Sequence, residues 1–214
     1  QELSDLADAI VNNAAYDIKL GGKKKDIAVL FVDIRGFTSL SEILPPEEMV
    51  AILNEYFEMV AHAVMDNGGD IDKFIGDAAM ALFNATNDLE DYVLQAVYAA
   101  WDIIKGASKL KEDCYEKYGK EVSFGIGVQC GEAIVGNIGC ECRMDYTAIG
   151  DVVNTASRLE SQAKAGQILI TDDVYEQVKK YVKVESIGKL ALKGKVQEIE
   201  TYQVTGINRK EASL

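Results

Sequence analysis

Two aspartates stand where the sequence predicts strand ends, and this pair of carboxylates is the first sign of chemistry. Asp33 ends the apolar run IAVLFVD at residues 27–33, which predicts a strand buried on both faces. Asp77 follows a glycine between the two short strand patterns of residues 70–84, which predicts a tight hairpin turn. A buried carboxylate needs backbone donors or a cation, and aspartate is common in turns, so each position alone also has a purely structural interpretation.

The elements that carry these aspartates are expected in the order β-α-β-β-α-β, with further elements after them. This order predicts an α/β (α+β), ferredoxin-like fold in which helices cover a mixed, mostly antiparallel sheet. The first strand then lies beside the first hairpin, so Asp33 and Asp77 are expected to be close together in space. The expected strands are 27–34, the pair around Gly76–Asp77, a hairpin in 122–139 turning near Cys130–Gly131, 167–171 and a pair in 182–204, and the expected helices are Pro46 to Asn67, about 88–118, 148–166 and 172–181.

Two carboxylates at the rim of a sheet are suitable ligands for a hard cation such as Mg²⁺. Magnesium commonly binds through one or two carboxylates together with phosphate oxygens of a substrate. The turn after the first strand contains Gly36, Phe37 and Thr38, and its backbone amides can hold outer phosphates of a nucleotide. The sequence therefore predicts a site for a metal and a phosphorylated ligand.

A second group of candidates lies on the expected helix at 148–166. Asn154 and Arg158 are four residues apart, so they share one helix face. A guanidinium beside an amide can grip a phosphoryl group as its negative charge grows, although a solvated or ion-paired arginine is the alternative. Lys73 in an apolar strand and Lys193 in a glycine-containing turn are weaker candidates for contacts with a nucleotide.

The overall charge limits the class of partner. The 214-residue chain has 22 basic and 35 acidic residues, a net charge of −13, which repels nucleic acid and anionic membranes. No apolar run approaches the roughly 18 residues needed to span a bilayer. The four cysteines are expected to be free thiols, and the domain is expected to be cytoplasmic, within a longer protein that can be tethered to a membrane.

Three motifs together resemble the class III nucleotide cyclase catalytic domain, the homology domain of adenylyl and guanylyl cyclases. They are FVDIRGFTSLSE, GGDIDKFIGDAAMALF and MDYTAIGDVVNTASRLES, and the resemblance runs from about Ile27 to Val204. It implies a head-to-tail homodimer with two sites, each built from both chains. Residues 26–206 are then the catalytic domain, 207–214 a tail, and 1–25 either a solvated leader or a helical connector from an upstream sensor, ending in the flexible basic joint GGKKK.

The resemblance also assigns roles within each site. Asp33, Asp77 and the Ile34 carbonyl of one chain would hold two Mg²⁺ ions, for which Mn²⁺ can substitute. Asn154 and Arg158 of the other chain would orient the ribose and stabilise the transition state. Lys193 would contact the triphosphate, and Lys73 and Thr147 match the pair that selects the purine.

The implied reaction converts ATP to 3′,5′-cyclic AMP and pyrophosphate, by attack of the ribose 3′-oxygen on the α-phosphorus. Lys73 can donate to adenine N1, and the Thr147 hydroxyl can accept from the 6-amino group, whereas guanine reverses both edges. The Lys/Thr pair resembles the branch that includes bicarbonate-stimulated enzymes. The alternatives are a guanylyl cyclase and an inactive cyclase-like module that only binds nucleotide or dimerises.

Overall fold

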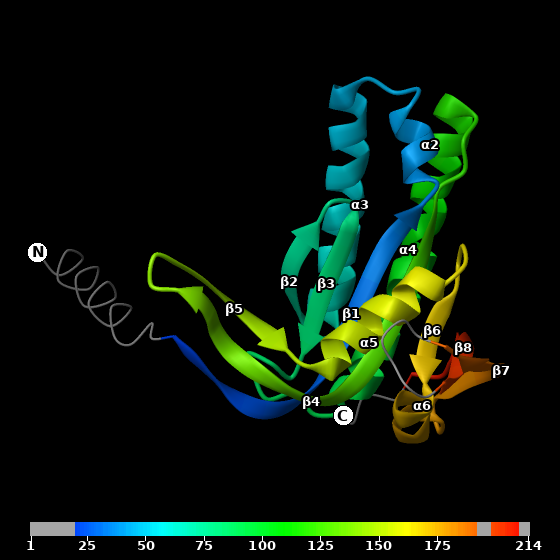
Figure 1. Ribbon diagram of the computed structural model, residues 1–214. Helices are drawn as coiled ribbons and strands as arrows, with labels where there is room; N and C mark the ends of the chain where they lie inside the picture. The colour runs from blue at the N-terminus through cyan, green and yellow to red at the C-terminus, as the bar shows by residue number, and fades with distance from the viewer. Residues whose placement is uncertain (1–19, 192–197, 210–214) are drawn as a thin grey trace, which may run out of the picture.

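An eight-stranded sheet is the framework of the residues described by this computed structural model, which are 20–191 and 198–209 (Figure 1). Its strands follow the order β2-β3-β1-β4-β6-β8-β7, and β5 pairs with β4. Neighbouring strands are antiparallel except β4 and β6, which are parallel, so the expected mixed, mostly antiparallel sheet is confirmed. The strands are β1 (Gly21–Arg35), β2 (Asp70–Ile75), β3 (Ala78–Phe83), β4 (Ser123–Cys140), β5 (Arg143–Ile149), β6 (Ile168–Thr171), β7 (Val182–Leu190) and β8 (Ile199–Ile207).

Helices cover the two faces of this sheet. They are α2 (Phe37–Ser41), α3 (Pro46–Asp66), α4 (Tyr92–Tyr118), α5 (Asp151–Gln162) and α6 (Asp172–Val178). Helix α3 has the predicted bounds, because Pro46 opens it, Glu47 and Glu48 lie in its first turn, and it ends before Asn67. In Figure 1, α5 lies in front of the sheet, while α3 and α4 lie behind it.

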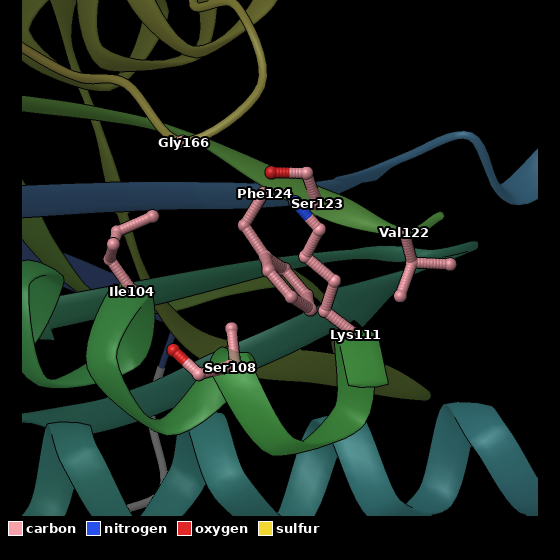
Figure 2. Close-up of a pocket in the computed structure, with 8 residues that line it drawn as sticks. Ile104, Ser108, Lys111, Val122, Ser123, Phe124 and Gly166 are labelled. Carbon is pink, nitrogen blue, oxygen red and sulfur yellow. The ribbon is translucent and has the colours of Figure 1, made fainter. Parts of the chain in front are cut away.

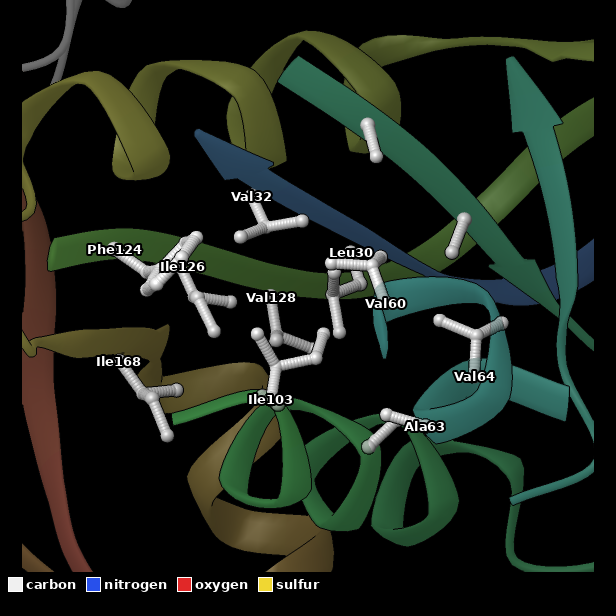
Figure 3. Close-up of a cluster of buried hydrophobic side chains, with 14 of the residues drawn as sticks. Leu30, Val32, Val60, Ala63, Val64, Ile103, Phe124, Ile126, Val128 and Ile168 are labelled. Carbon is white, nitrogen blue, oxygen red and sulfur yellow. The ribbon is translucent and has the colours of Figure 1, made fainter. Parts of the chain in front are cut away.

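Strand β1 is buried on both faces, as its apolar run predicts. Alternate residues of the strand face opposite ways. Ala28, Leu30 and Val32 belong to the larger core, which includes residues of α3 and α4, and Figure 3 shows Leu30 and Val32 beside Val128 and Ile103. Ile27, Val29 and Phe31 instead join a smaller cluster with residues of α5. Asp33 continues this second series, so its side chain lies on the α5 face.

Two expectations about strand ends are wrong. GGKKK is not a flexible joint, because β1 begins at Gly21 and residues 21–26 pair with residues 132–137 of β4. The turn expected near Cys130–Gly131 is absent, because β4 continues to Cys140 and the chain turns between Cys140 and Arg143. The same extension explains both errors: the first residues of β1 supply the partner that keeps the second half of β4 extended. β1, β4 and β5 project from the body as an arm (Figure 1).

Some expectations fall outside the described residues, namely the connector at 1–19, the turn at Lys193–Lys195 and the end of the tail at 210–214. Within the described part of the chain, no helix is both long and apolar enough to cross a membrane.

Candidate active site

The end of β1 and the β2–β3 hairpin bring the two predicted aspartates together. Asp33 pairs with Ala78, the residue that follows Asp77. Gly76 forms the hairpin turn with a φ of 62°, a conformation that favours glycine. The two carboxylates are therefore neighbours at one sheet rim, as the predicted topology requires.

The electrostatics of Asp33 fit a cation ligand. Its Oδ1 is buried and has no hydrogen-bond partner among the described residues. Burial raises the pKa of the Asp33 carboxyl, and the charge of Asp77 raises it further, while Arg35 and the Ile34 amide act in the opposite direction. Two mutually repelling carboxylates with an unpaired buried oxygen suit a divalent ion.

The protein ligands available for such an ion are few. In the described ranges, no three His, Cys, Asp or Glu side chains gather as a possible metal site. The two aspartates would thus need backbone carbonyl and substrate oxygens to complete the coordination, which is the ligand set typical of Mg²⁺.

Arg35 links this rim to helix α5. Its Nη1 lies 2.8 Å from Asp33 Oδ2, and its Nη2 lies 2.6 Å from Glu160 Oε1. It also donates to the backbone carbonyls of Glu160 and Ala163, at 2.5 and 3.1 Å. Burial raises the pKa of the Glu160 carboxyl, and Arg35 opposes that shift. Neither Arg35 nor Glu160 is among the residues predicted from the sequence, although the two-residue spacing of Asp33 and Arg35 places both on one strand face.

The predicted phosphate-binding turn is the start of helix α2. Gly36 precedes the helix with a φ of 90°, and a Cβ there would lie 2.8 Å from the Glu121 carbonyl oxygen. The position therefore requires glycine. Phe37 and Thr38 open the helix, where backbone N–H groups have no acceptor within the helix itself.

Helix α5 presents Asn154 and Arg158 away from its packed face. Val152, Ala156 and Leu159 are buried against the sheet, whereas Asn154 is exposed and Arg158 is half-buried. Neither side chain makes a hydrogen bond or ion pair with another described residue, Asp33 and Asp77 included. Within the described part of one chain, no such interaction therefore links the two predicted groups.

Lys73 and Thr147 do meet, through a residue that the sequence analysis missed. The Thr147 hydroxyl donates to Asp72 Oδ2 at 3.0 Å, and Lys73 Nζ lies 3.4 Å from the same oxygen. Thr147 is buried and the Lys73 side chain is 40% exposed. Strand β5 thus places Thr147 beside β2, 75 positions away in sequence from Asp72.

A separate pocket of about 160 Å³ lies between α4 and the beginning of β4. Figure 2 shows Ile104, Ser108 and Lys111 of α4 facing Phe124 across it. Phe124 belongs to the larger core, on the sheet face opposite to α5. None of the predicted site residues lines this pocket.

The motifs and their placement agree with a known family. The family described as "Adenylate and Guanylate cyclase catalytic domain" matches residues 21–206. This chain belongs to that family. The family's match begins at Gly21, at the first residue of β1, and so includes the five residues that the sequence analysis assigned to a joint.

Relatives of both cyclase types are similar to the chain. The adenylate cyclase of Anabaena cylindrica is 37% identical over 187 residues, which cover 83% of this chain and 36% of that protein. The solved adenylyl cyclase CyaB from P. aeruginosa is 35% identical with a TM-score of 0.84, covering 89% of this chain and 98% of that one. The solved guanylyl cyclase Cya2 is 34% identical with a TM-score of 0.84, covering 90% of this chain and 98% of that one.

Proposed function

We propose that this domain is an adenylyl cyclase, which converts ATP to 3′,5′-cyclic AMP and pyrophosphate. The ribose 3′-hydroxyl gives up its proton to solvent as its oxygen attacks the α-phosphorus, and pyrophosphate leaves with the electron pair of the broken P–O bond. The observation that carries the proposal is the Asp33–Asp77 pair with its unpaired buried oxygen, in a chain of the cyclase family.

Asp33, Asp77 and the carbonyl of Ile34 are the groups that would hold two Mg²⁺ ions, or Mn²⁺ in their place. The ions, when bound, supply positive charge that favours ionisation of the 3′-hydroxyl and offsets the charge of the phosphates. The pKa of Asp33 is raised by burial and by the charge of Asp77, and a bound cation would offset both effects.

The other residues of the chain position the nucleotide. The amides at Gly36, Phe37 and Thr38 bind phosphate oxygens at the beginning of α2. Asn154 orients the ribose, and the planar guanidinium of Arg158 stabilises the negative charge that grows on the α-phosphoryl group. Lys193, which lies outside the described residues, is assigned to the triphosphate. Catalysis then rests on positioning and electrostatics, without a covalent intermediate on the protein.

The reaction site is assigned to a head-to-tail homodimer, in which Asp33 and Asp77 of one chain face Asn154 and Arg158 of the other. Support comes from the two α5 side chains, which have no partner within the described residues of their own chain. Large apolar side chains are also exposed near the predicted site and on the arm, and a second copy would cover them; they are Phe74, Ile75, Ile134, Tyr146 and Ile149.

The choice of ATP over GTP rests on Lys73 and Thr147. Similar solved domains include both adenylyl and guanylyl cyclases, so fold similarity alone does not select the base. Lysine only donates hydrogen bonds, which fits N1 of adenine and opposes the N1–H of guanine.

The test is incubation of the purified domain with Mn²⁺ and either ATP or GTP, followed by identification of the product. Cyclic AMP as the main product supports the proposal. Cyclic GMP in excess would instead indicate a guanylyl cyclase. Nucleotide binding without any cyclic product would favour the inactive module.

A further inference from the structure

The pairing of β2 with β3 shifts by one residue at Asp72. Ile71 pairs with Ala81 and Lys73 pairs with Met80, so Asp72 is the extra residue of a β-bulge. Bulges interrupt the alternation of a strand and redirect a side chain. The bulge explains how Asp72 and Lys73, although adjacent in sequence, approach each other through their side chains.

The Asp72 carboxylate is almost completely enclosed. Its side chain is 1% exposed, its Oδ2 accepts the Thr147 hydroxyl proton, and the ammonium of Lys73 lies 3.4 Å from the same oxygen. Its Oδ1 is buried without a hydrogen-bond partner among the described residues. A buried carboxylate with an unpaired oxygen costs stability, so its position calls for a functional explanation.

The consequence for Thr147 follows from the chemistry of a hydroxyl. Threonine has a single O–H proton and two lone pairs. Because that proton is directed to Asp72, only lone pairs remain for a ligand. Thr147 is then fixed as an acceptor, which fits the 6-amino group of adenine and repels the O6 acceptor of guanine.

We propose that Asp72 is a positioning residue for base selection, which holds Thr147 as an acceptor and anchors the ammonium of Lys73. The inference rests on the proposed function, because it assigns Lys73 and Thr147 to the purine. Asp72 itself does not contact the base, since its free oxygen is buried. Without Asp72, the Thr147 hydroxyl can rotate and donate to O6, so discrimination against guanine weakens.

The test compares Asp72→Ala and Asp72→Asn with the wild-type domain on ATP, GTP and purine riboside triphosphate, which lacks the 6-amino group. In Asp72→Ala, the preference for ATP over each of the other two nucleotides should fall by about fivefold to tenfold, the value of roughly one hydrogen bond. Asp72→Asn should show a smaller fall, because its amide oxygen can still accept from Thr147. In a Thr147→Val background, Asp72→Ala should change the preference for the 6-amino group no further.

Asp70→Ala is the matched control, because Asp70 also lies on β2 and also accepts a threonine hydroxyl, that of Thr86. It should leave both ratios unchanged. Ratios are measured as kcat/KM and as binding of non-hydrolysable analogues, so they can be read even if turnover fails. If the wild-type domain forms no cyclic AMP, the proposed function is wrong. Absence of nucleotide binding by the wild type would likewise overturn the proposed function. Unchanged ratios in Asp72→Ala, with ATP preferred by the wild type, would overturn the role of Asp72 alone, as would equal loss with all three nucleotides.

Discussion

Asp33 and Asp77 form one acidic centre of this domain, and Asp72 forms another with different surroundings. Both Asp33 and Asp72 keep a buried carboxylate oxygen with no hydrogen-bond partner among the described residues. Asp33 lies beside a second carboxylate, and Arg35 is the cation that contacts it. Asp72 lies between the ammonium of Lys73 and the hydroxyl of Thr147.

The difference lies in the charge that surrounds each unpaired oxygen. Around Asp33, the guanidinium of Arg35 pairs with both Asp33 and Glu160, and the charge of Asp77 lies beside them, so a further cation would stabilise the group. Around Asp72, one ammonium faces one carboxylate, so the pair is already balanced. An unpaired buried oxygen therefore indicates a metal ligand only where its neighbours leave negative charge in excess.

The largest effect is expected at the acidic pair. Asp33→Ala or Asp77→Ala should lower metal-dependent cyclase activity by at least about 100-fold, because a group that stabilises transition-state charge is lost. The fold should persist, since removal of one carboxylate relieves repulsion at the rim. Activity assays with Mg²⁺ and Mn²⁺ beside thermal melts check this. Near-normal activity in either folded variant would rule out the metal assignment.

Mixing inactive variants tests whether each site draws on two chains. Asp33→Ala and Arg158→Ala should each be nearly inactive alone. Random exchange makes half of the dimers mixed, each with one intact site, so about a quarter of wild-type sites should return. The recovery should decline on dilution, because association follows mass action. If subunit exchange is shown independently and no activity returns, the shared site is wrong.

A moderate effect is expected at the base-selecting pair. Lys73→Glu combined with Thr147→Cys should lower ATP turnover and shift the ATP-to-GTP ratio of kcat/KM toward GTP by at least about tenfold, because glutamate accepts where guanine donates. Steady-state kinetics with both nucleotides measure the ratio. A ratio equal to that of the wild type would mean that the base is read by other residues.

The smallest effect is expected in the pH dependence of stability without metal. The pKa of Asp33 is raised above its ordinary value of 3.8 in the folded chain. The folded state thus holds this proton more tightly than the unfolded state, and the stability it contributes is full below pH 3.8 and is lost as the pH rises through the raised value. Asp33→Asn should therefore melt higher than the wild type at neutral pH, with the difference vanishing in acid.

Added Mg²⁺ sharpens the same measurement. At neutral pH it should raise the melting temperature of the wild type and leave Asp33→Asn almost unchanged, because a ligand that binds only the folded state stabilises it. An equal response of both proteins to Mg²⁺ would place the ion elsewhere.

The sequence predicted what local patterns determine. The apolar run before Asp33 and the glycine before Asp77 predict a strand and a turn, and the order of elements then makes the two aspartates neighbours. Contacts between segments that are distant in sequence were not predicted. The polar residues 21–25 carry no local strand pattern, and they pair with β4 in the structure. Likewise, the role of Asp72 depends on a bulge and on Thr147, and that of Arg35 on Glu160, 125 positions away.

The length of β1 has a mechanical consequence. Its 15 residues amount to roughly 50 Å of chain at the usual rise of a strand, and β4 pairs with it from Gly21 to Arg35. A continuous ladder of backbone hydrogen bonds restricts the bending and stretching of the strand. Slow hydrogen exchange along residues 21–26 would verify this. A displacement of the arm at Gly21 would then be passed along one continuously paired strand, about 40 Å of extended chain, to Asp33, where it would alter the spacing of the carboxylates.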